Sequence, residues 1–162
     1  MVAMRQLRIR DAHLGDVTAL QEIFRRASWS NESDRQLLTE HPEFLELSDN
    51  AIREGRTRVA VMADVAVGFA TLAISQSAAE LGDLFVDPAW MRHGVATALV
   101  ADAKVLVRAN GAARIEVDAN DHALRFYESA GFLSLGRIAL PHGFATRMAV
   151  EVDCSSESRS TG

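Results

Sequence analysis

The sequence predicts an α/β (α+β) fold in which a mostly antiparallel sheet contains one β-α-β crossover. Strand patterns, in which apolar side chains alternate with polar ones or run together briefly, recur in seven segments, and helical spacing of apolar residues occurs in four others. The longest helical pattern lies between two strand patterns, as a crossover connection requires. Because the chain has 162 residues, we expect a single domain over residues 1–152, followed by a disordered tail at residues 153–162.

The N-terminal part of the chain predicts one strand and two helical regions. Residues 6–10 alternate polar and apolar side chains and are expected to form the first strand. Asp16 can cap the helix that follows and runs to about residue 27. A second helical region covers roughly residues 34–53, and Pro42 interrupts or restarts it because proline lacks the backbone donor of a helical hydrogen bond.

Three strands are expected next. Residues 56–62 and 65–74 are rich in β-forming side chains and are separated by Ala63-Asp64 alone, which predicts antiparallel neighbours. Residues 81–86 form a shorter strand, which ends before the Asp-Pro pair because proline restricts the residue that precedes it and cannot pair within a sheet.

The C-terminal part predicts the crossover helix and the rest of the sheet. Apolar residues at helical spacing begin at Val95, and Asn110-Gly111 ends this helix. The remaining elements are a strand, a short helix that closes at Gly131, and two final strands, at residues 114–117, 121–130, 132–138 and 145–152.

Composition excludes several classes of protein. The net charge of −5 argues against general electrostatic binding of nucleic acid. The single cysteine, Cys154, can form neither an internal disulfide nor a structural zinc site, and the five scattered histidines lack ligand spacing, so we expect no metal. The longest charge-free run, residues 65–79, is shorter than the roughly 20 apolar residues of a membrane span. We therefore expect a cytoplasmic protein, and its sixteen arginines against one lysine are typical of a GC-rich bacterial genome.

One segment has the features of a phosphate-binding loop. Residues 87–99, DPAWMRHGVATAL, join a strand to the long helix through a loop with two basic residues and Gly94. The first N–H groups of a helix have no partners within the helix, and the positive end of its dipole favours anions, while glycine lets the backbone approach a ligand closely. The pattern is neither G-x-G-x-x-G nor a P-loop, and an ordinary turn would look the same.

Two motifs stand in order between residues 80 and 132. The first is LFVDP (residues 84–88), followed by a loop of the pattern Q/R-x-x-G-x-G/A, which reads MRHGVA here and has Met91 in place of the usual Gln or Arg. The second is N-x-x-A-x-x-x-Y-x-x-x-G-F, which is matched by Asn120, Ala123, Tyr127, Gly131 and Phe132. With these motifs the chain resembles the GNAT family of acetyl-CoA-dependent N-acyltransferases.

The resemblance implies a more detailed fold and a cosubstrate. The fold would be a GNAT-like central sheet of about seven strands flanked by about four helices and splayed between the fourth and fifth strands. The cosubstrate would be acetyl-CoA, and no metal would take part. The backbone of Phe85 and Val86 would bind the pantetheine arm, and Asn120 would bond the arm through its side-chain amide. Six residues would hold the pyrophosphate, namely Arg92, His93, Gly94, Val95, Ala96 and Thr97.

The resemblance also implies catalytic roles. Acyl transfer to an amine needs a held thioester, a neutral amine, an oxyanion site and a proton for the leaving thiolate. Tyr127, the only tyrosine in the chain, would supply this proton and contact the cosubstrate. Glu80 is the candidate base, with Asp83 or no dedicated base as the alternatives. Simpler roles stay open, since Asn120 also fits a helix cap, Tyr127 a half-buried aromatic and Glu80 an exposed strand-end charge.

The implied function is transfer of the acetyl group of acetyl-CoA to a primary amine by direct attack in a ternary complex. The alternatives are a non-catalytic acyl-CoA-binding module and a protein amine in place of a small-molecule or peptide acceptor. The family builds its acceptor pocket from regions that correspond to residues 28–50 and 138–144, where Trp29 is a pocket wall or a core anchor. A homodimer through the last strands is a further option. Six acids between residues 30 and 50 would suit a cationic amine or form solvated helix faces, namely Glu32, Asp34, Glu40, Glu43, Glu46 and Asp49.

Overall fold

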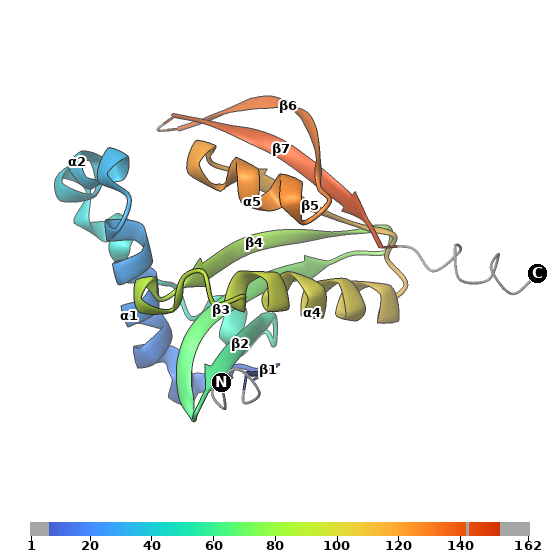
Figure 1. Ribbon diagram of the computed structural model, residues 1–162, viewed down its shortest axis with the longest axis horizontal. Coiled ribbons are helices and arrows are strands. Elements are labelled where there is room, and N and C mark those ends of the chain that lie inside the picture. Colours follow the sequence, from blue (N-terminus) through green and yellow to red (C-terminus); the bar gives the residue numbers. More distant parts are fainter. Residues whose placement is uncertain (1–6, 142, 153–162) are drawn as a thin grey trace, which may run out of the picture. The chain divides into compact units, whose positions relative to one another are not determined.

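The computed structural model describes residues 7–141 and 143–152 (Figure 1). Its strands are β1 (Arg8–Asp11), β2 (Thr57–Met62), β3 (Val65–Ile74), β4 (Ala78–Val86), β5 (Arg114–Ala119), β6 (Leu133–Leu140) and β7 (Gly143–Glu151). Its α-helices are α1 (Val17–Trp29), α2 (Glu32–Glu40), α3 (Asn50–Arg53), α4 (Val95–Ala109) and α5 (Leu124–Ser129). The element order is the predicted one, and a 3₁₀ turn at Pro42–Leu45 interrupts the second helical region where proline was expected to do so.

The strands form one sheet in the order β1-β2-β3-β4-β5-β7-β6. The β1–β2, β2–β3, β5–β7 and β6–β7 pairs are antiparallel, and β4 and β5 are parallel, as the crossover through α4 requires. The parallel register joins Ala78–Leu81 to Arg114–Val117, so it covers the first part of β4 alone. This is the expected splay between the fourth and fifth strands, and the predicted fold class is confirmed.

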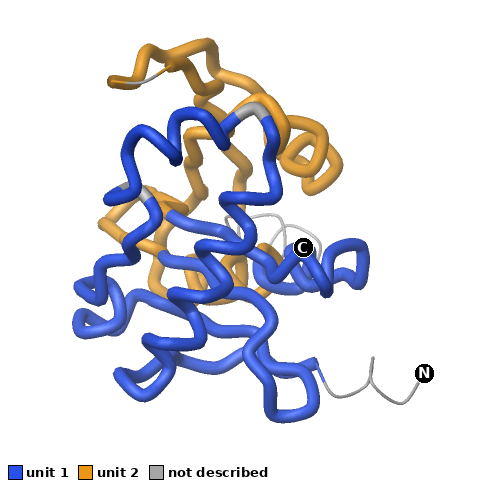
Figure 2. Tube along the Cα trace, turned by 90° about the vertical axis from the view of Figure 1, so that its left-hand side faces the viewer, with its two compact units in different colours: residues 1–71, 83–99 blue, residues 72–82, 100–162 orange. Residues whose placement is uncertain are grey.

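The chain folds into two compact units (Figure 2). Unit 1 contains residues 1–71 and 83–99, and unit 2 contains residues 72–82 and 100–162. The single domain expected over residues 1–152 stays a prediction, and the expected tail at residues 153–162 lies outside the described residues. Within the described part of the chain, no helix is long and apolar enough to cross a membrane.

Unit 1 has a core in which α1 packs on β2 and β3. The spacing of apolar residues on α1 buries Leu20 and Ile23 against this core, while charged side chains occupy the opposite face of the helix. Phe85, near the end of β4, joins the core through edge-to-face contact with Phe24 at 4.9 Å and tilted contact with Phe69 at 5.7 Å between ring centroids. These contacts anchor the end of β4, where the first motif lies.

The start of α1 differs from the sequence prediction. Asp16 stands at the N-cap position, but its side chain makes no capping hydrogen bond. It instead accepts two hydrogen bonds from Arg10, at 2.9 and 3.0 Å, and one from the backbone N–H of His13 at 2.9 Å. The Arg10 hydrogen bonds hold the pKa of Asp16 below its usual range. Burying a carboxylate is costly unless an opposite charge is paired with it, and Arg10 provides that charge. Because Arg10 belongs to β1, the ion pair connects this strand to the start of α1.

Unit 2 contains most of α4 together with the C-terminal strands and α5. Alternate residues of β5 are buried, and the others carry charged side chains, so that Glu116 and Asp118 lie on the opposite face of the strand from Val117. The buried apolar side chains of this unit include Val100, Ala103, Val107, Ile115, Val117, Ala119, Tyr127, Phe132 and Met148. β4 begins at Ala78, three residues before the predicted start, because its first residues pair with β5 and no local pattern reveals such a partner.

Candidate active site

The end of β4 is held firmly in unit 1. The N–H of Asp87 donates to the carbonyl of Val67 at 2.8 Å, and the Asp87 carboxylate accepts from the N–H of Ala89 at 3.0 Å and from Arg26 at 2.9 Å. Val86 is buried, and the Phe85 side chain packs in the core. The side chains of Phe85 and Val86 therefore pack inside the protein. This arrangement is compatible with the resemblance, which implies that only their backbone groups would bind the pantetheine arm.

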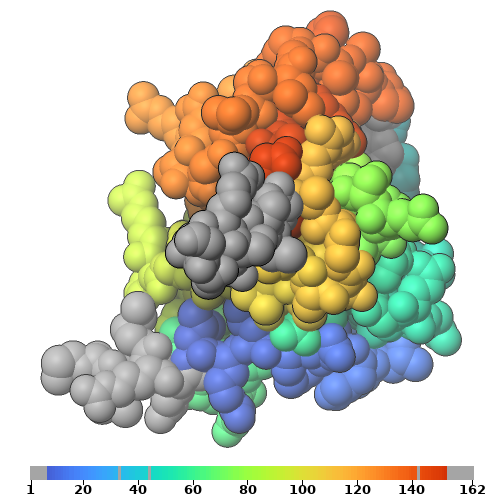
Figure 3. Space-filling model, turned by 90° about the vertical axis from the view of Figure 1, so that its right-hand side faces the viewer, coloured from blue at the N-terminus to red at the C-terminus, as the bar shows by residue number. Residues whose placement is uncertain are grey.

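The loop between β4 and α4 has an unusual backbone. After a 3₁₀ turn at Pro88–Trp90, Arg92 and Gly94 both adopt positive φ angles, of 67° and 81°. A Cβ on Gly94 would find no protein atom within 4 Å, so the space above this residue is open. The loop is solvent-exposed, and Figure 3 shows it in yellow-green at the surface.

The first turn of α4 offers unpaired donors. The helix hydrogen bonds begin with the N–H of Ala98 donating to the carbonyl of Gly94 at 3.0 Å, which leaves the N–H groups of residues 95–97 without helical partners. Val95 is buried and holds the turn in place, whereas Thr97 is exposed. Backbone donors at the start of a 15-residue helix favour an anion such as pyrophosphate.

Gly68 on β3 sets the position of this helix start. A Cβ at residue 68 would lie 2.9 Å from Cγ1 of Val95 and 3.0 Å from the carbonyl oxygen of Phe85. Gly68 therefore lets the strand lie closer to the helix start and to the end of β4 than a residue with a Cβ would allow without a shift of its neighbours. The two motifs do not include Gly68, although a glycine inside a strand pattern is a known signal of close backbone approach.

Asn120 and Tyr127 lie in unit 2, where the second motif forms a 3₁₀ turn (Asp121–Ala123) and α5. Asn120 occupies the position before this turn, but its side chain makes no capping hydrogen bond and is exposed. Tyr127 is buried, with its ring 5.2 Å from those of Phe126 and Phe132 in edge-to-face geometry. Gly131 has a φ of 97° and ends the helix as predicted, so the motif builds a fixed frame around the tyrosine.

Glu80, also in unit 2, belongs to a charged cluster that no local sequence pattern predicts. Arg147 on β7 donates two hydrogen bonds to the Glu80 carboxylate, at 2.9 and 2.8 Å, one to Asp118 at 2.7 Å and a very short one to Glu116. The strand register places Glu80 opposite Glu116, and Asp118 opposite Arg147. Arg114 adds a second contact to Glu116 at 2.5 Å.

The cluster shifts the ionisation of its members. The hydrogen bonds that Arg147 donates to the carboxylates, first of all to Glu80, raise the pKa of Arg147, and the hydrogen bond from Arg147 lowers the pKa of Glu116. Within the described residues, no three His, Cys, Asp or Glu side chains form a group that could hold a metal ion. A charged residue between the buried Thr146 and Met148 of β7 was the signal that could have pointed to Arg147.

Asp83, the alternative base, lies in unit 1 rather than with Glu80. Its carboxylate accepts a hydrogen bond from the Thr71 hydroxyl at 2.9 Å, and it borders a small space lined largely by core residues. The two candidate bases therefore have different surroundings. Glu80 is held by a guanidinium, whereas Asp83 is held by a neutral hydroxyl.

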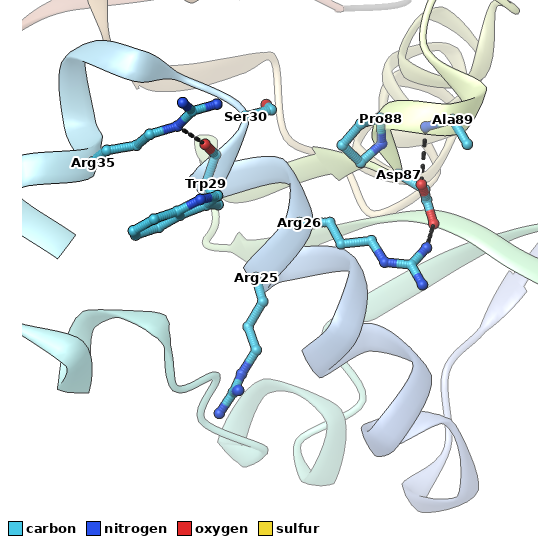
Figure 4. Close-up of a pocket in the computed structure, with 8 residues that line it drawn as sticks. All are labelled: Arg25, Arg26, Trp29, Ser30, Arg35, Asp87, Pro88 and Ala89. Carbon is cyan, nitrogen blue, oxygen red and sulfur yellow. Dashed lines mark hydrogen bonds and ion pairs between the residues drawn. The ribbon is translucent and has the colours of Figure 1, made fainter. Parts of the chain in front are cut away.

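Unit 1 also contains a pocket of about 530 Å³ between the end of α1, the start of α2 and the residues after β4 (Figure 4). Arg25, Arg26 and Arg35 line it, with Asp87 as the one acidic lining residue. Trp29 forms part of its wall and is 43% exposed, so it is a pocket wall rather than a core anchor. The six acidic residues between positions 30 and 50 do not line this pocket.

A family model for the acetyltransferase (GNAT) domain matches residues 31–151. The chain belongs to the GNAT acetyltransferase family. It is therefore an acetyl-CoA-dependent N-acetyltransferase, as the two motifs led us to expect, and acetyl-CoA is its cosubstrate.

Solved structures of GNAT proteins share the fold. Ard1 from Thermoplasma volcanium is 22% identical, with a TM-score of 0.70 over 90% of this chain and 97% of that chain. PaiA N-acetyltransferase from Thermoplasma acidophilum, solved in complex with coenzyme A, is 18% identical, with a TM-score of 0.69 over 90% and 98% of the two chains. The ribosomal-protein-S18-alanine N-acetyltransferase from Escherichia coli is 20% identical, with a TM-score of 0.67 over 91% and 94%. At these identities the likeness is one of fold, and no curated protein matched the chain.

Proposed function

We propose that this GNAT enzyme transfers the acetyl group of acetyl-CoA to a primary amine by direct attack in a ternary complex. The observation that carries the proposal is the loop at the start of α4, where backbone donors without helical partners and the open space at Gly94 follow a firmly held strand end. Bound acetyl-CoA supplies an activated thioester. In this proposal, Arg92–Thr97 bind its diphosphate, and the backbone of Phe85 and Val86 binds the pantetheine arm.

The strand end and Asn120 orient the acyl donor in this scheme. A backbone N–H at Phe85 or Val86 polarises the thioester carbonyl and stabilises the charge that develops on its oxygen. The Asn120 amide, which makes no capping hydrogen bond, is available to bond the arm. Holding the donor in one orientation converts a bimolecular reaction into one between bound groups.

Tyr127 supplies the proton for the leaving thiolate in this proposal. A phenol keeps its proton at neutral pH and can release it to a stronger base. The packing of Tyr127 between two phenylalanines supports a fixed position for the ring. No other tyrosine in the chain can substitute for it.

Glu80 is the proposed base, acting on the amine directly or through water. Both of its carboxylate oxygens bond Arg147, so a proton transfer to Glu80 would have to displace one of these hydrogen bonds. If Glu80 is the base, Glu80→Gln should lower kcat/KM by about 100-fold or more. An unchanged kcat/KM would assign the role to Asp83 or to no residue, and Asp83→Asn separates these two outcomes.

The proposed acceptor is a small-molecule or peptide amine rather than a folded protein. The pocket volume in unit 1, about 530 Å³, lies within the range of about 300–1,000 Å³ typical of small-ligand sites. We also propose a cytoplasmic and bacterial setting, based on the single cysteine and the excess of arginine over lysine.

We further propose a homodimer through the last two strands. β6 is the final strand in the sheet order, and large apolar side chains on β6 and β7 are exposed, namely Leu133, Leu135, Leu140 and Phe144. Light scattering over a range of concentrations tests this. A dimer that Leu135→Asp dissociates is expected, and a wild-type monomer at all concentrations would overturn the proposal.

The proposed function is tested by measuring thiol release from acetyl-CoA over a panel of amines, together with the Kd of CoA from calorimetry. Turnover with at least one primary amine, with acetylated amine found by mass spectrometry, is the expected result. Binding of CoA without turnover across the panel would instead favour a non-catalytic acyl-CoA-binding module.

A further inference from the structure

We propose that the acceptor carries an anionic group, a carboxylate or a phosphate, next to a planar or apolar body, and that the Arg25–Trp29–Arg35 pocket of unit 1 binds this part of it. The inference rests on the proposed function and names the substrate class that the enzyme acetylates. The pocket is the one shown in Figure 4, and all of its lining residues belong to unit 1.

The acidic residue of the pocket is already neutralised. Asp87 bonds Arg26 at 2.9 Å with one carboxylate oxygen and the N–H of Ala89 at 3.0 Å with the other. Arg26 also lies 3.6 Å from Glu22 on its own helix. The Arg26–Asp87 pair is therefore part of the wall, and the charge left to the pocket comes from Arg25 and Arg35.

Arg35 is held in place while most of its donors stay available. Its Nε donates to the carbonyl of Trp29 at 2.8 Å, and its guanidinium carbon lies 6.0 Å from the centre of the Trp29 ring. The nearest carboxylate, Glu32, is 4.0 Å away and 88% exposed, and such surface pairs contribute little. A guanidinium that is oriented but not satisfied is well suited to bind a carboxylate or phosphate through two donors.

Arg25 provides the second cation. Within the described residues it has no hydrogen bond or ion pair, and in Figure 4 its side chain extends away from the Arg26–Asp87 pair and, on the other side of Trp29, away from Arg35. Two guanidiniums with free donors and no unpaired carboxylate among the lining residues make the pocket cationic. An acceptor that is purely cationic would be repelled there, which argues against a polyamine.

Trp29 selects the body of the ligand. A tryptophan that is 43% exposed beside arginines offers a flat face for a planar or apolar group. Three of the six acids between positions 30 and 50 are engaged away from the pocket. Glu40 accepts from Gln36 at 3.3 Å, Glu43 lies 3.1 Å from His41, and Asp49 lies 3.1 Å from Arg53.

The pocket adjoins the proposed acyl-donor site along the chain. Asp87, Pro88 and Ala89 form one wall, and they directly follow Val86, whose backbone is proposed to hold the pantetheine arm. A ligand bound in this pocket would therefore lie beside the strand end that is proposed to hold the pantetheine arm. A phosphate group of CoA could bind the same arginines. The test therefore distinguishes an anionic group on the acceptor from a phosphate of CoA.

The test compares paired amines with and without an anionic group, phenylalanine against phenylalaninamide and O-phosphoethanolamine against ethanolamine, with each kcat/KM expressed per neutral amine. Wild type should prefer the anionic member of at least one pair by about tenfold or more in kcat/KM. Arg25→Gln and Arg35→Gln should each reduce this preference by about ten- to a hundredfold while leaving the Kd of CoA unchanged. Arg8→Gln, which alters a 73%-exposed arginine on β1, is the matched control and should change nothing.

Binding is measured separately from turnover. Trp90→Phe leaves Trp29 as the only tryptophan, so its fluorescence reports occupancy of the pocket. An equal or reversed preference in both pairs, or a rise in the Kd of CoA in the Arg25 and Arg35 variants, would overturn the inference. Arginine-dependent binding without turnover of any amine would support the pocket and overturn the proposed function instead.

Discussion

Arg147 of unit 2 and two pocket arginines of unit 1, Arg25 and Arg35, differ in how far they are already engaged by carboxylates. In unit 2, Arg147 bonds three carboxylates on neighbouring strands and is only 27% exposed. In unit 1, Arg25 has no partner among the described residues, and Arg35 bonds a backbone carbonyl. The same residue type joins strands in one place and leaves donors for a ligand in the other. The surroundings decide this difference, because an arginine whose donors are satisfied by carboxylates gains nothing from a further anion.

The largest expected effect tests whether unit 2 carries the proton chemistry. Tyr127→Phe keeps the ring contacts with Phe126 and Phe132 but removes the hydroxyl. We expect kcat to fall by about 100-fold or more, with the Kd of CoA unchanged, because the acid acts in the transition state alone. Thiol-release kinetics and calorimetry measure the two constants. An unchanged kcat removes Tyr127 as the acid.

The second prediction concerns the removal of Arg147, the arginine of unit 2 that bonds three carboxylates. Arg147→Met leaves Glu80, Glu116 and Asp118 close together without their shared cation, and we expect a loss of about 1–3 kcal/mol in the free energy of unfolding at pH 7. Arg137→Met, which removes an exposed pair with Asp121, is the control and should cost less than about 1 kcal/mol. Denaturant unfolding measures both, and equal losses would show that the cluster adds nothing.

The same cluster predicts a pH dependence. The pKa of Glu116 is lowered in the folded protein, mainly by the Arg147 hydrogen bond, so folding favours the ionised carboxylate. This stabilisation is complete above the ordinary pKa of 4.5 and is lost as the pH falls through the lower folded-state value. The difference in stability between wild type and Arg147→Met should therefore shrink below about pH 4.5. A constant difference from pH 7 to pH 3 would contradict this.

The third prediction compares Gly94→Ala, in the loop proposed to bind the diphosphate, with Gly111→Ala at a matched glycine elsewhere in the chain. Gly94 and Gly111 have φ angles of 81° and 83°, and a Cβ at either would meet no protein atom within 4 Å. Replacing either by alanine should cost about 1 kcal/mol of stability through backbone strain. Gly94→Ala alone should raise the Kd of CoA, by about tenfold, because its Cβ enters the space proposed for the diphosphate. Equal Kd values in the two variants would place the diphosphate elsewhere.

The smallest effect concerns Asn120. If its amide bonds the pantetheine arm, Asn120→Ala should weaken CoA binding by about three- to tenfold, the effect of one neutral hydrogen bond. Its Tm should stay close to that of wild type, because the side chain makes no capping hydrogen bond. A fall in Tm without a change in the Kd of CoA would assign Asn120 to the helix start instead.

Much of the fold was predictable from local patterns. The element order, the break at Pro42 and the helix end at Gly131 all follow from spacing and from residues with restricted or unusual backbone angles. Local patterns did not predict the hydrogen bonds of Asp16. Its type and position predicted a cap, but Arg10 on β1 lies close enough to take the carboxylate, and an ion pair outweighs a capping bond there.

The sequence by itself determined the family, and it singled out the loop before α4 and the tyrosine at the centre of the second motif, because these depend on residues that are near one another along the chain. Tertiary structure alone decided the Arg147 cluster, the contact of Gly68 with Val95 and the cationic pocket beside Trp29. Each of these joins residues that are 27 to 67 positions apart, or depends on which of several arginines is left without a carboxylate. Charge and size can be read from a sequence, but whether a charge is satisfied depends on partners that only folding brings within reach.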